Sequence, residues 1–310
     1  MTQNTEPAFD FTITRLQRNP IISPRIFGWR VFRGKNINGP SLVKVPDWVE
    51  EPLGKYYLYF GHHQGQYIRL AHAEQPEGPY TLYKPGVLHN KDTFIGSKHL
   101  ASPEIYIDEE NKQVRMYFHA AIRGTGAFYD QGQTSYLAMS TDGIHFIPRE
   151  EIMGPFYMRV FTHDGWFFSI GKNDNVDAML LRSKDGLHQF ERGPTFEPHF
   201  RHCALLKRGN ILHVFYTKAF EKPESILHAT MNLEGDWTTW TLGGGRVVLR
   251  PERDWEGATL PLKESRYGGT GKANALRDPC IFEDGNGEQV YLLYSVKGEK
   301  GIAIATIDGL

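Results

Sequence analysis

The feature that most constrains the fold is a unit that occurs five times along the chain. Each copy contains an aromatic-rich run that follows a shorter apolar run across a Gly, Asp or Asn turn: KYYLYF, VRMYFHA, WFFSI, LHVFY and VYLLYS. A further run then ends in small residues, as in YIRLAHA, SYLAMS, AMLLRS, SILHAT and GIAIAT. Repetition at a period of tens of residues is typical of solenoids and radial arrays.

A fourth run completes the unit in the middle copies, where TDGIHF, KDGLHQF and EGDWTTW place aromatic residues after a turn. Four antiparallel strands per copy, at a spacing of roughly 40 to 60 residues, predict propeller blades. No window shows the 3.6-residue periodicity of a helix, so we expect an all-β chain. A β-sandwich with long loops is the alternative.

The sequence therefore predicts one five-bladed β-propeller domain over residues 1–310. The blades are expected near residues 38–84, 101–150, 155–194, 200–242 and 277–310. The last copy ends after three strands, and we expect FDFTIT, residues 9–14, to supply its fourth strand. That strand would join both ends of the chain in one blade, close the ring and leave no open sheet edge.

Composition limits the classes of partner and compartment. The chain has 35 basic and 36 acidic residues and a formal net charge of −1, so its overall charge predicts neither nucleic acid nor membrane binding. Its two cysteines, Cys203 and Cys280, exclude a disulfide framework and a cysteine-ligated zinc site. No signal-peptide pattern or long apolar segment is present. We expect a cytoplasmic protein, and its oligomeric state stays open.

One mouth of the propeller is predicted to be rich in cations. The start of the first strand and the end of the second strand of each blade lie at the same face, because the two strands are antiparallel. The predicted substrate-binding residues at this face are Asn38, His63, His119, Arg159, Arg201, Lys218 and Arg277. The guanidinium fork suits carboxylate, sulfate or phosphate groups, so we expect an anionic ligand. Alternatively, the cations lie on a solvated rim and pair with loop acids such as Asp254, Glu256 and Glu264.

The motifs ASPEIY and RDPCIF open the first strands of the second and fifth copies. With the five repeats, they resemble the five-bladed propeller glycoside hydrolases: arabinanases and xylosidases (family 43), invertase-like fructosidases (family 32) and neoagarooligosaccharide hydrolases (family 117). In those families an acid-plus-proline motif opens several first strands and directs carboxylates into the funnel. The resemblance covers the whole chain at the level of blades. It implies that Glu104 and Asp278 are catalytic acid and base groups.

The sequence also departs from these families. Their base typically sits at the start of the first blade, where this chain has Asn38-Gly39-Pro40-Ser41, so the standard mechanism does not follow. His202 is a third catalytic candidate, because an imidazole titrates near neutrality and some members of the superfamily use a histidine as proton donor. The alternative is a buried structural histidine.

The long segment Gly243–Leu276 contains RDWEGA, which supplies two further binding candidates. Trp255 could stack on a sugar ring and Glu256 could hold its hydroxyl groups, because loops of this length often close over a site. The alternative is an ordinary turn with Trp255 packed at a blade junction. The sequence predicts no cofactor and no metal site, although it leaves open a single cation in the channel, for which His62, His119 and His202 could be ligands.

The sequence thus predicts a glycoside hydrolase-like enzyme that cleaves a small anionic oligosaccharide by general acid/base catalysis in the funnel. Two alternatives stay open, because one fold supports many activities. The first is a lyase that acts on a uronate-containing sugar, with a His or Tyr base. The second is a propeller that binds a sugar without catalysis.

Overall fold

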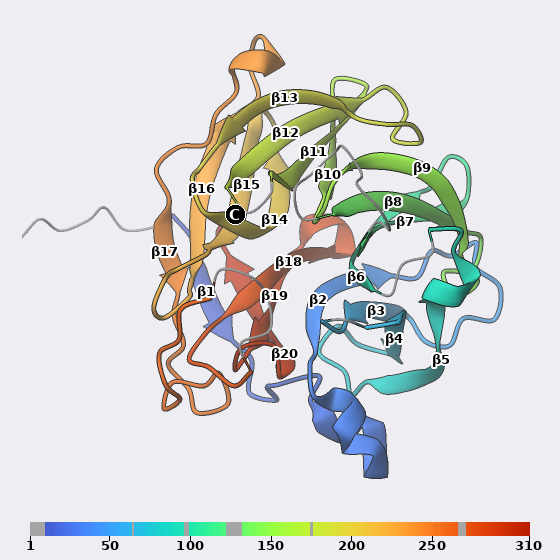
Figure 1. Ribbon diagram of the computed structural model, residues 1–310, viewed down its shortest axis with the longest axis vertical. Coiled ribbons are helices and arrows are strands. Elements are labelled where there is room, and N and C mark those ends of the chain that lie inside the picture. Colours follow the sequence, from blue (N-terminus) through green and yellow to red (C-terminus); the bar gives the residue numbers. More distant parts are fainter. Residues whose placement is uncertain (1–9, 64, 96–98, 122–131, 174–175, 266–270) are drawn as a thin grey trace, which may run out of the picture.

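The computed structural model describes residues 10–63, 65–95, 99–121, 132–173, 176–265 and 271–310. It consists of five four-stranded antiparallel sheets arranged around a central channel (Figure 1). The first strand of each sheet lies nearest the channel and contacts the first strands of the neighbouring sheets. The predicted five-bladed β-propeller is therefore confirmed.

The strands of each blade follow one another along the chain. The first blade contains β2 (Asn38–Lys44), β3 (Tyr56–Gly61), β4 (Tyr67–Ala73) and β5 (Thr81–His89). The second contains β6 (Leu100–Asp108), β7 (Gln113–Ala121), β8 (Gln133–Ser140) and β9 (Ile147–Pro155). The third contains β10 (Arg159–His163), β11 (Trp166–Asn173), β12 (Asp177–Ser183) and β13 (Glu191–Phe196).

The last two blades follow the same order, except that the outer strand of the fifth blade comes from the N-terminal part of the chain. The fourth contains β14 (Phe200–Arg208), β15 (Ile211–Lys218), β16 (Ile226–Asn232) and β17 (Arg246–Leu249). The fifth contains β18 (Arg277–Asp284), β19 (Gln289–Val296), β20 (Gly301–Asp308) and β1 (Thr12–Arg15). Within the described ranges, four 3₁₀ helices lie between strands: η1 (Pro24–Gly34), η2 (Asn90–Asp92), η3 (Trp237–Thr239) and η4 (Gly285–Gly287).

Strand β1 closes the ring, as predicted. It pairs antiparallel with β20, with Thr12 opposite Asp308 and Arg15 opposite Ala305. The predicted strand began at Phe9, which lies outside the described residues. Among the described residues, no helix has the length and apolar character that crossing a bilayer requires.

The fourth strands lie later in the chain than predicted. TDGIHF, KDGLHQF and EGDWTTW form turns or a 3₁₀ helix, and the outer strands β9, β13 and β17 follow them. The reason is the Asp in each segment. The Oδ1 of Asp142 accepts the amides of Ile144 and His145, both at 2.8 Å, and an Asp that binds the backbone two residues later favours a turn.

Aromatic side chains from facing sheets form the cores between the blades. Tyr59 and Phe118 lie in the cluster that joins the first two blades, and Phe215 and Tyr294 lie in the cluster that joins the last two. All four are at most 1% exposed. The repeated aromatic runs of the sequence therefore fill these cores.

The junction between the third and fourth blades provides a test of this packing. A Cβ added at Gly193 would lie 2.3 Å from Cζ3 of the buried Trp237, so Gly193→Ala forces the indole to move. Overpacking of this kind costs about 1–3 kcal/mol, which urea unfolding would measure. Gly244→Ala is the matched control, because no atom lies within 4 Å of its added Cβ. Equal free energies of unfolding for the two variants would show that Trp237 does not pack closely against Gly193.

Candidate functional site

The first strands carry a common bulge at the channel mouth. In β2, β6 and β18 the register shifts where an X-Pro pair stands, and the residue before the proline has a positive φ: Gly39 (58°), Ser102 (51°) and Asp278 (48°). Tyr157, just before β10, also has a positive φ, of 65°. Bulges re-aim side chains, and three of these residues line one pocket.

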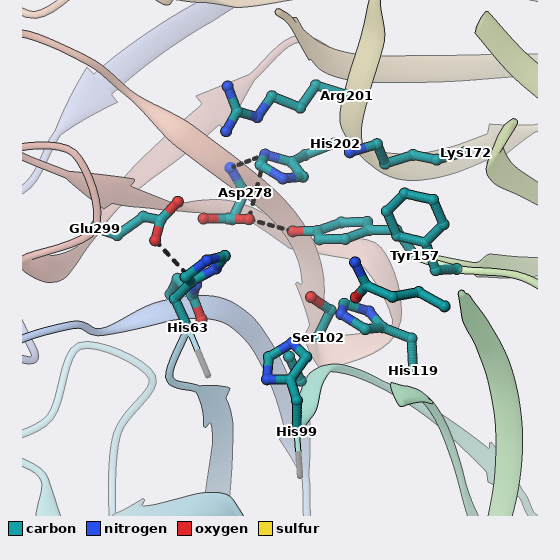
Figure 2. A pocket seen from close by; sticks show the side chains of 14 residues that line it. His63, His99, Ser102, His119, Tyr157, Lys172, Arg201, His202, Asp278 and Glu299 are labelled. Atoms are coloured by element: carbon teal, nitrogen blue, oxygen red, sulfur yellow. Dashed lines mark hydrogen bonds and ion pairs between the residues drawn. The ribbon is translucent and has the colours of Figure 1, made fainter. Parts of the chain in front are cut away.

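This pocket has a volume of about 420 Å³ and is lined by all five blades (Figure 2). It contains six of the predicted site residues: Asn38, His63, His119, Arg201, His202 and Asp278. Its remaining lining residues are His99, Ala101, Ser102, Gln133, Phe156, Tyr157, Lys172 and Glu299. Two carboxyl groups, those of Asp278 and Glu299, are thus in the pocket with several cationic or imidazole side chains.

Asp278 is the central carboxyl group. Its side chain is buried, and the hydroxyl of Tyr157 donates to its Oδ1. His202 Nδ1 lies 3.2 Å from the same oxygen and accepts the amide of Asp278 at 3.4 Å. Its Oδ2 makes no hydrogen bond within the described part of the chain. One oxygen is therefore fixed, and the other is buried on the side of Glu299 and Ser295 with no acceptor role filled by hydrogen-bond geometry.

The two carboxyl groups differ in acidity. Burial, and next the negative charge of Glu299, raise the pKa of Asp278 to about 6. Burial alone would raise the pKa of Glu299 too, but Arg277 and Asn36 outweigh it, so that pKa is lowered. Glu299 stays ionised at neutral pH, whereas Asp278 changes its protonation state near pH 6.

A buried ion-pair network supports Glu299 and the pocket wall. Arg277 Nη1 donates to Glu299 Oε1 at 3.0 Å, and its Nε donates to Glu224 Oε2 at 2.6 Å. Arg201 Nη1 reaches the same Glu224 oxygen at 3.2 Å. All four side chains are at most 2% exposed. Arg277, a predicted binding residue, thus lies behind the pocket and holds Glu299.

Two of the pocket histidines, His119 and His202, are neutral at physiological pH. Burial, then Arg201 and Lys172, lower the pKa of His202 well below its usual value. Burial, then His99 and Lys172, do the same for His119. Nδ1 of His119 has no hydrogen-bond partner among the described residues. A neutral imidazole has one nitrogen that accepts a proton, so His119 can act as an acceptor in the pocket.

Glu104 does not line this pocket. Glu104 follows Pro103, whereas Asp278 precedes Pro279. Regular pairing resumes after the bulge at Glu104 in β6 and at Cys280 in β18, so Cys280, and not Asp278, is the counterpart of Glu104. Glu104 lies 3.3 Å from Arg159 Nε, and Arg159 is 1% exposed with its guanidinium over the Tyr157 ring. Glu104 and Arg159, both predicted site residues, therefore form an ion pair with each other, and neither lines the pocket.

The other predicted binding residues lie elsewhere. Lys218 forms an ion pair with Glu197 at 2.7 Å. Trp255 packs against the core cluster of the last two blades. Glu256 is fully buried and accepts bonds from Arg15 at 2.7 Å and Tyr294 at 3.0 Å. The contacts of Trp255 and Glu256 fix the long segment to the ring. None of the three residues lines the pocket.

Sequence reasoning missed several lining residues, above all Glu299, Tyr157 and His99. Lys172 stands at the end of a second strand, the position that predicts a cation at the mouth, and it does line the pocket. Glu299 lies in the turn between β19 and β20, beyond the predicted strand end. In the described ranges, no three His, Cys, Asp or Glu side chains are placed to hold a metal ion, so His62, His119 and His202 form no such group. A single cation in the channel stays a prediction.

Solved structures that resemble this fold include glycoside hydrolases. A glycosyl hydrolase from Bacteroides ovatus superposes with a TM-score of 0.65 at 11% identity, over 98% of this chain and 95% of that one. A GH43_1 enzyme from Xanthomonas citri, complexed with xylose, gives 0.59 at 13% identity, over 87% of each chain. At these identities the similarity establishes the fold.

A further match comes from the GH130 family, which is described as mannoside phosphorylases that include hydrolases of β-1,2 mannosidic linkages. Its TM-score is 0.65 at 12% identity, over 98% of this chain and 96% of that chain. The predicted resemblance to five-bladed propeller glycosidases is thus confirmed at the level of fold.

Sequence comparison gives a relative of full length. No protein-family model matches the chain. An uncharacterized protein of Acanthamoeba polyphaga mimivirus is 34% identical over 331 aligned positions, which cover 95% of this chain and 90% of that protein. The chain, a five-bladed β-propeller, therefore belongs to the same family as this mimivirus protein.

Proposed function

We propose that the pocket hydrolyses a glycosidic bond of a small anionic oligosaccharide, with Asp278 as the general acid. The observation that carries the proposal is a buried carboxyl group at the pocket, with a pKa of about 6 and an Oδ2 oxygen that has no hydrogen-bond partner among the described residues. A glycosidase needs such an acid to protonate the leaving oxygen. The fold shared with glycoside hydrolases supports the same activity.

Tyr157 and His202 position this acid. The Tyr157 hydroxyl donates a hydrogen bond to Oδ1, and His202 Nδ1 accepts a hydrogen bond from the backbone N–H of Asp278. Because Oδ1 already accepts a hydrogen bond, we place the proton of the acid form on Oδ2. We take Oδ2 to be the oxygen that a glycosidic oxygen meets in the substrate complex, because its hydrogen-bonding capacity is unfilled among the described residues. His202 is a positioning residue in this scheme and does not act as the proton donor.

Glu299 is a poor base or nucleophile. Arg277 and two asparagines bind its oxygens, with Asn36 at 2.6 Å and Asn38 at 3.2 Å from Oε2. The lowered pKa of Glu299 also indicates a weak base, because a carboxylate that accepts several N–H hydrogen bonds binds a proton weakly. We therefore expect water to attack the anomeric carbon directly. Its proton passes by way of neutral His119 to solvent, because burial and the neighbouring His99 lower the pKa of His119 and make it a weak base as well. A single displacement of this kind inverts the anomeric configuration.

A lyase is the second candidate. One observation favours it: among the described lining residues, Glu299 is held by Arg277, so Asp278 is the one carboxyl group with an available oxygen. Elimination next to a uronate carboxylate needs one base and a cation that neutralises the enolate, and no second carboxylate. Its product contains a conjugated double bond and absorbs ultraviolet light, which a hydrolysis product does not.

A screen of oligosaccharides tests the proposal. The full-length protein is incubated near pH 5.5 with uronate-bearing, sulfated and neutral oligosaccharides, and new reducing ends are quantified while NMR follows the first-formed anomer. We expect cleavage of an anionic member with inversion. Appearance of an ultraviolet-absorbing unsaturated product would identify the lyase. Saturable binding without any product over hours would identify a sugar-binding propeller. We also propose a cytoplasmic location, which the two cysteines and the lack of a signal-peptide pattern or long apolar segment in the sequence support.

A further inference from the structure

We propose that Arg201 and Lys172 form a subsite for the carboxylate of a uronic acid unit, next to Asp278. The inference rests on the proposed function in one respect, since it takes the ligand of the pocket to be a sugar. It adds the chemical group that the cationic wall recognises and the two side chains that bind it.

Arg201 has a donor that the protein does not use. Its Nη1 donates to Glu224 at 3.2 Å and to the backbone and side-chain oxygens of Ser265 at 3.0 and 3.1 Å. Its Nη2 has no acceptor among the described residues, although the side chain is only 1% exposed and lines the pocket. A buried donor without an acceptor is costly, and an oxygen of a ligand would satisfy it.

Lys172 supplies the second cation. Figure 2 shows Lys172 and Arg201 beside His202, away from His63 and His99. Burial and then these two charges, ahead of those of Arg277 and Arg159, lower the pKa of His202, as expected for cations that lie near its ring. The ammonium group also lies 4.7 Å from the centre of the Phe156 ring, another lining side chain. A guanidinium and an ammonium on one wall match an anion with two oxygens.

The charge of the pocket favours a monoanion. Lys172, Arg201 and Arg277 are cationic, and Glu224 and Glu299 are ionised around them. When Asp278 is protonated, this group of buried residues has one positive charge in excess. A uronate carries one negative charge across the physiological range, whereas a phosphate group has a second pKa near 6 and changes from one negative charge to nearly two as pH rises to 7. One carboxylate therefore neutralises the net charge of these buried residues when Asp278 is protonated and can donate its proton.

Binding of the carboxylate is consequently linked to protonation of Asp278. The groups that face Asp278 are Glu299, Tyr157, Ser295, Arg277 and His202. A carboxylate held by Arg201 and Lys172 adds negative charge near them and raises the pKa of Asp278 further. At pH 7, above its pKa of about 6, Asp278 is mostly ionised, so binding takes up close to one proton. At pH 5 it is already protonated, and binding takes up none.

Calorimetric titration of the full-length protein measures both properties. The probes are glucuronate, galacturonate and mannuronate, each against its neutral parent sugar and against inorganic phosphate. The experiment is run at pH 7 in two buffers of different ionisation enthalpy and again at pH 5. We expect at least one uronate to bind about ten- to hundred-fold tighter than its parent, the worth of one charge-assisted hydrogen bond. Proton uptake is expected at pH 7 and not at pH 5.

Two variants and a control assign the subsite. Lys172→Met and Arg201→Lys should each reduce the preference for the uronate about ten-fold or more, the first by removing the charge and the second by removing the planar fork. Arg201→Lys keeps a cation beside Glu224, so it preserves the buried ion pair. Lys184→Met is the matched control, because Lys184 is exposed and stacks on Trp166 outside the pocket.

The outcomes separate this inference from the proposed function. Equal binding of uronates and neutral sugars overturns the subsite, and so does tighter binding of phosphate than of every uronate. Cleavage of a neutral oligosaccharide without uronate binding overturns the subsite and leaves the hydrolase in place. Uronate binding with proton uptake but no cleavage of any oligosaccharide supports the subsite and contradicts the proposed activity.

Discussion

Asp278→Asn is expected to lower kcat/KM about a hundred- to ten-thousand-fold, the contribution of a positioned general acid. The amide has the same shape as the carboxyl group and can still accept the Tyr157 hydroxyl, so the fold should persist. What is lost is the proton on Oδ2, the oxygen that no described residue occupies. Steady-state kinetics on the oligosaccharide found in the screen measures this effect.

The pH dependence of the wild-type enzyme follows from the same group. A general acid works in its protonated form, and the pKa of Asp278 is raised from the usual value to about 6 by burial and Glu299. Activity should therefore fall as pH rises through about 6, and this limb should be absent from the residual activity of Asp278→Asn. Asp254→Asn, at an exposed aspartate of the long segment, is the control and should match the wild type. Retention of full activity by Asp278→Asn would exclude it as the acid.

The repeat made the fold predictable, because five aromatic runs can be buried together only if their sheets face one another around a ring. The outer strands were misplaced for a local reason. Asp142 and its counterparts Asp185 and Asp236 bind backbone amides two residues on, so segments that look like strands in composition form turns.

The site was only partly predictable. Asp278 and Glu104 stand on opposite sides of a proline, and the bulge at that proline turns one toward the pocket and the other toward Arg159. The sequence distinguishes the two positions, but their consequence depends on the register of the neighbouring strand. Glu299 was missed because a turn residue has no periodicity that reveals its direction. Arg277 was placed at the mouth by its strand position, whereas its partners Glu224 and Glu299 hold it behind the pocket.

Glu224→Leu is expected to destabilise the protein by about 3–5 kcal/mol, the cost of leaving buried charges without their partner. One Glu224 oxygen accepts from both Arg201 and Arg277, at 3.2 and 2.6 Å, and the other accepts the Thr217 hydroxyl at 3.0 Å. Leucine fills a similar volume but leaves two guanidinium groups that are at most 1% exposed. A loss of this size is a large share of the stability of an ordinary domain.

Urea unfolding of Glu224→Leu and of a matched exposed pair separates burial from charge. Glu264 forms an ion pair with Lys222 at 3.1 Å, and both side chains are about half exposed. Glu264→Ala should therefore cost at most about 1 kcal/mol, because solvent screens such pairs. Glu224→Gln should lie between the two variants, since the amide keeps an acceptor for Thr217 while it loses the charge. If Glu224→Leu were no more destabilised than Glu264→Ala, the network would not be what holds Arg201 and Arg277 at the pocket.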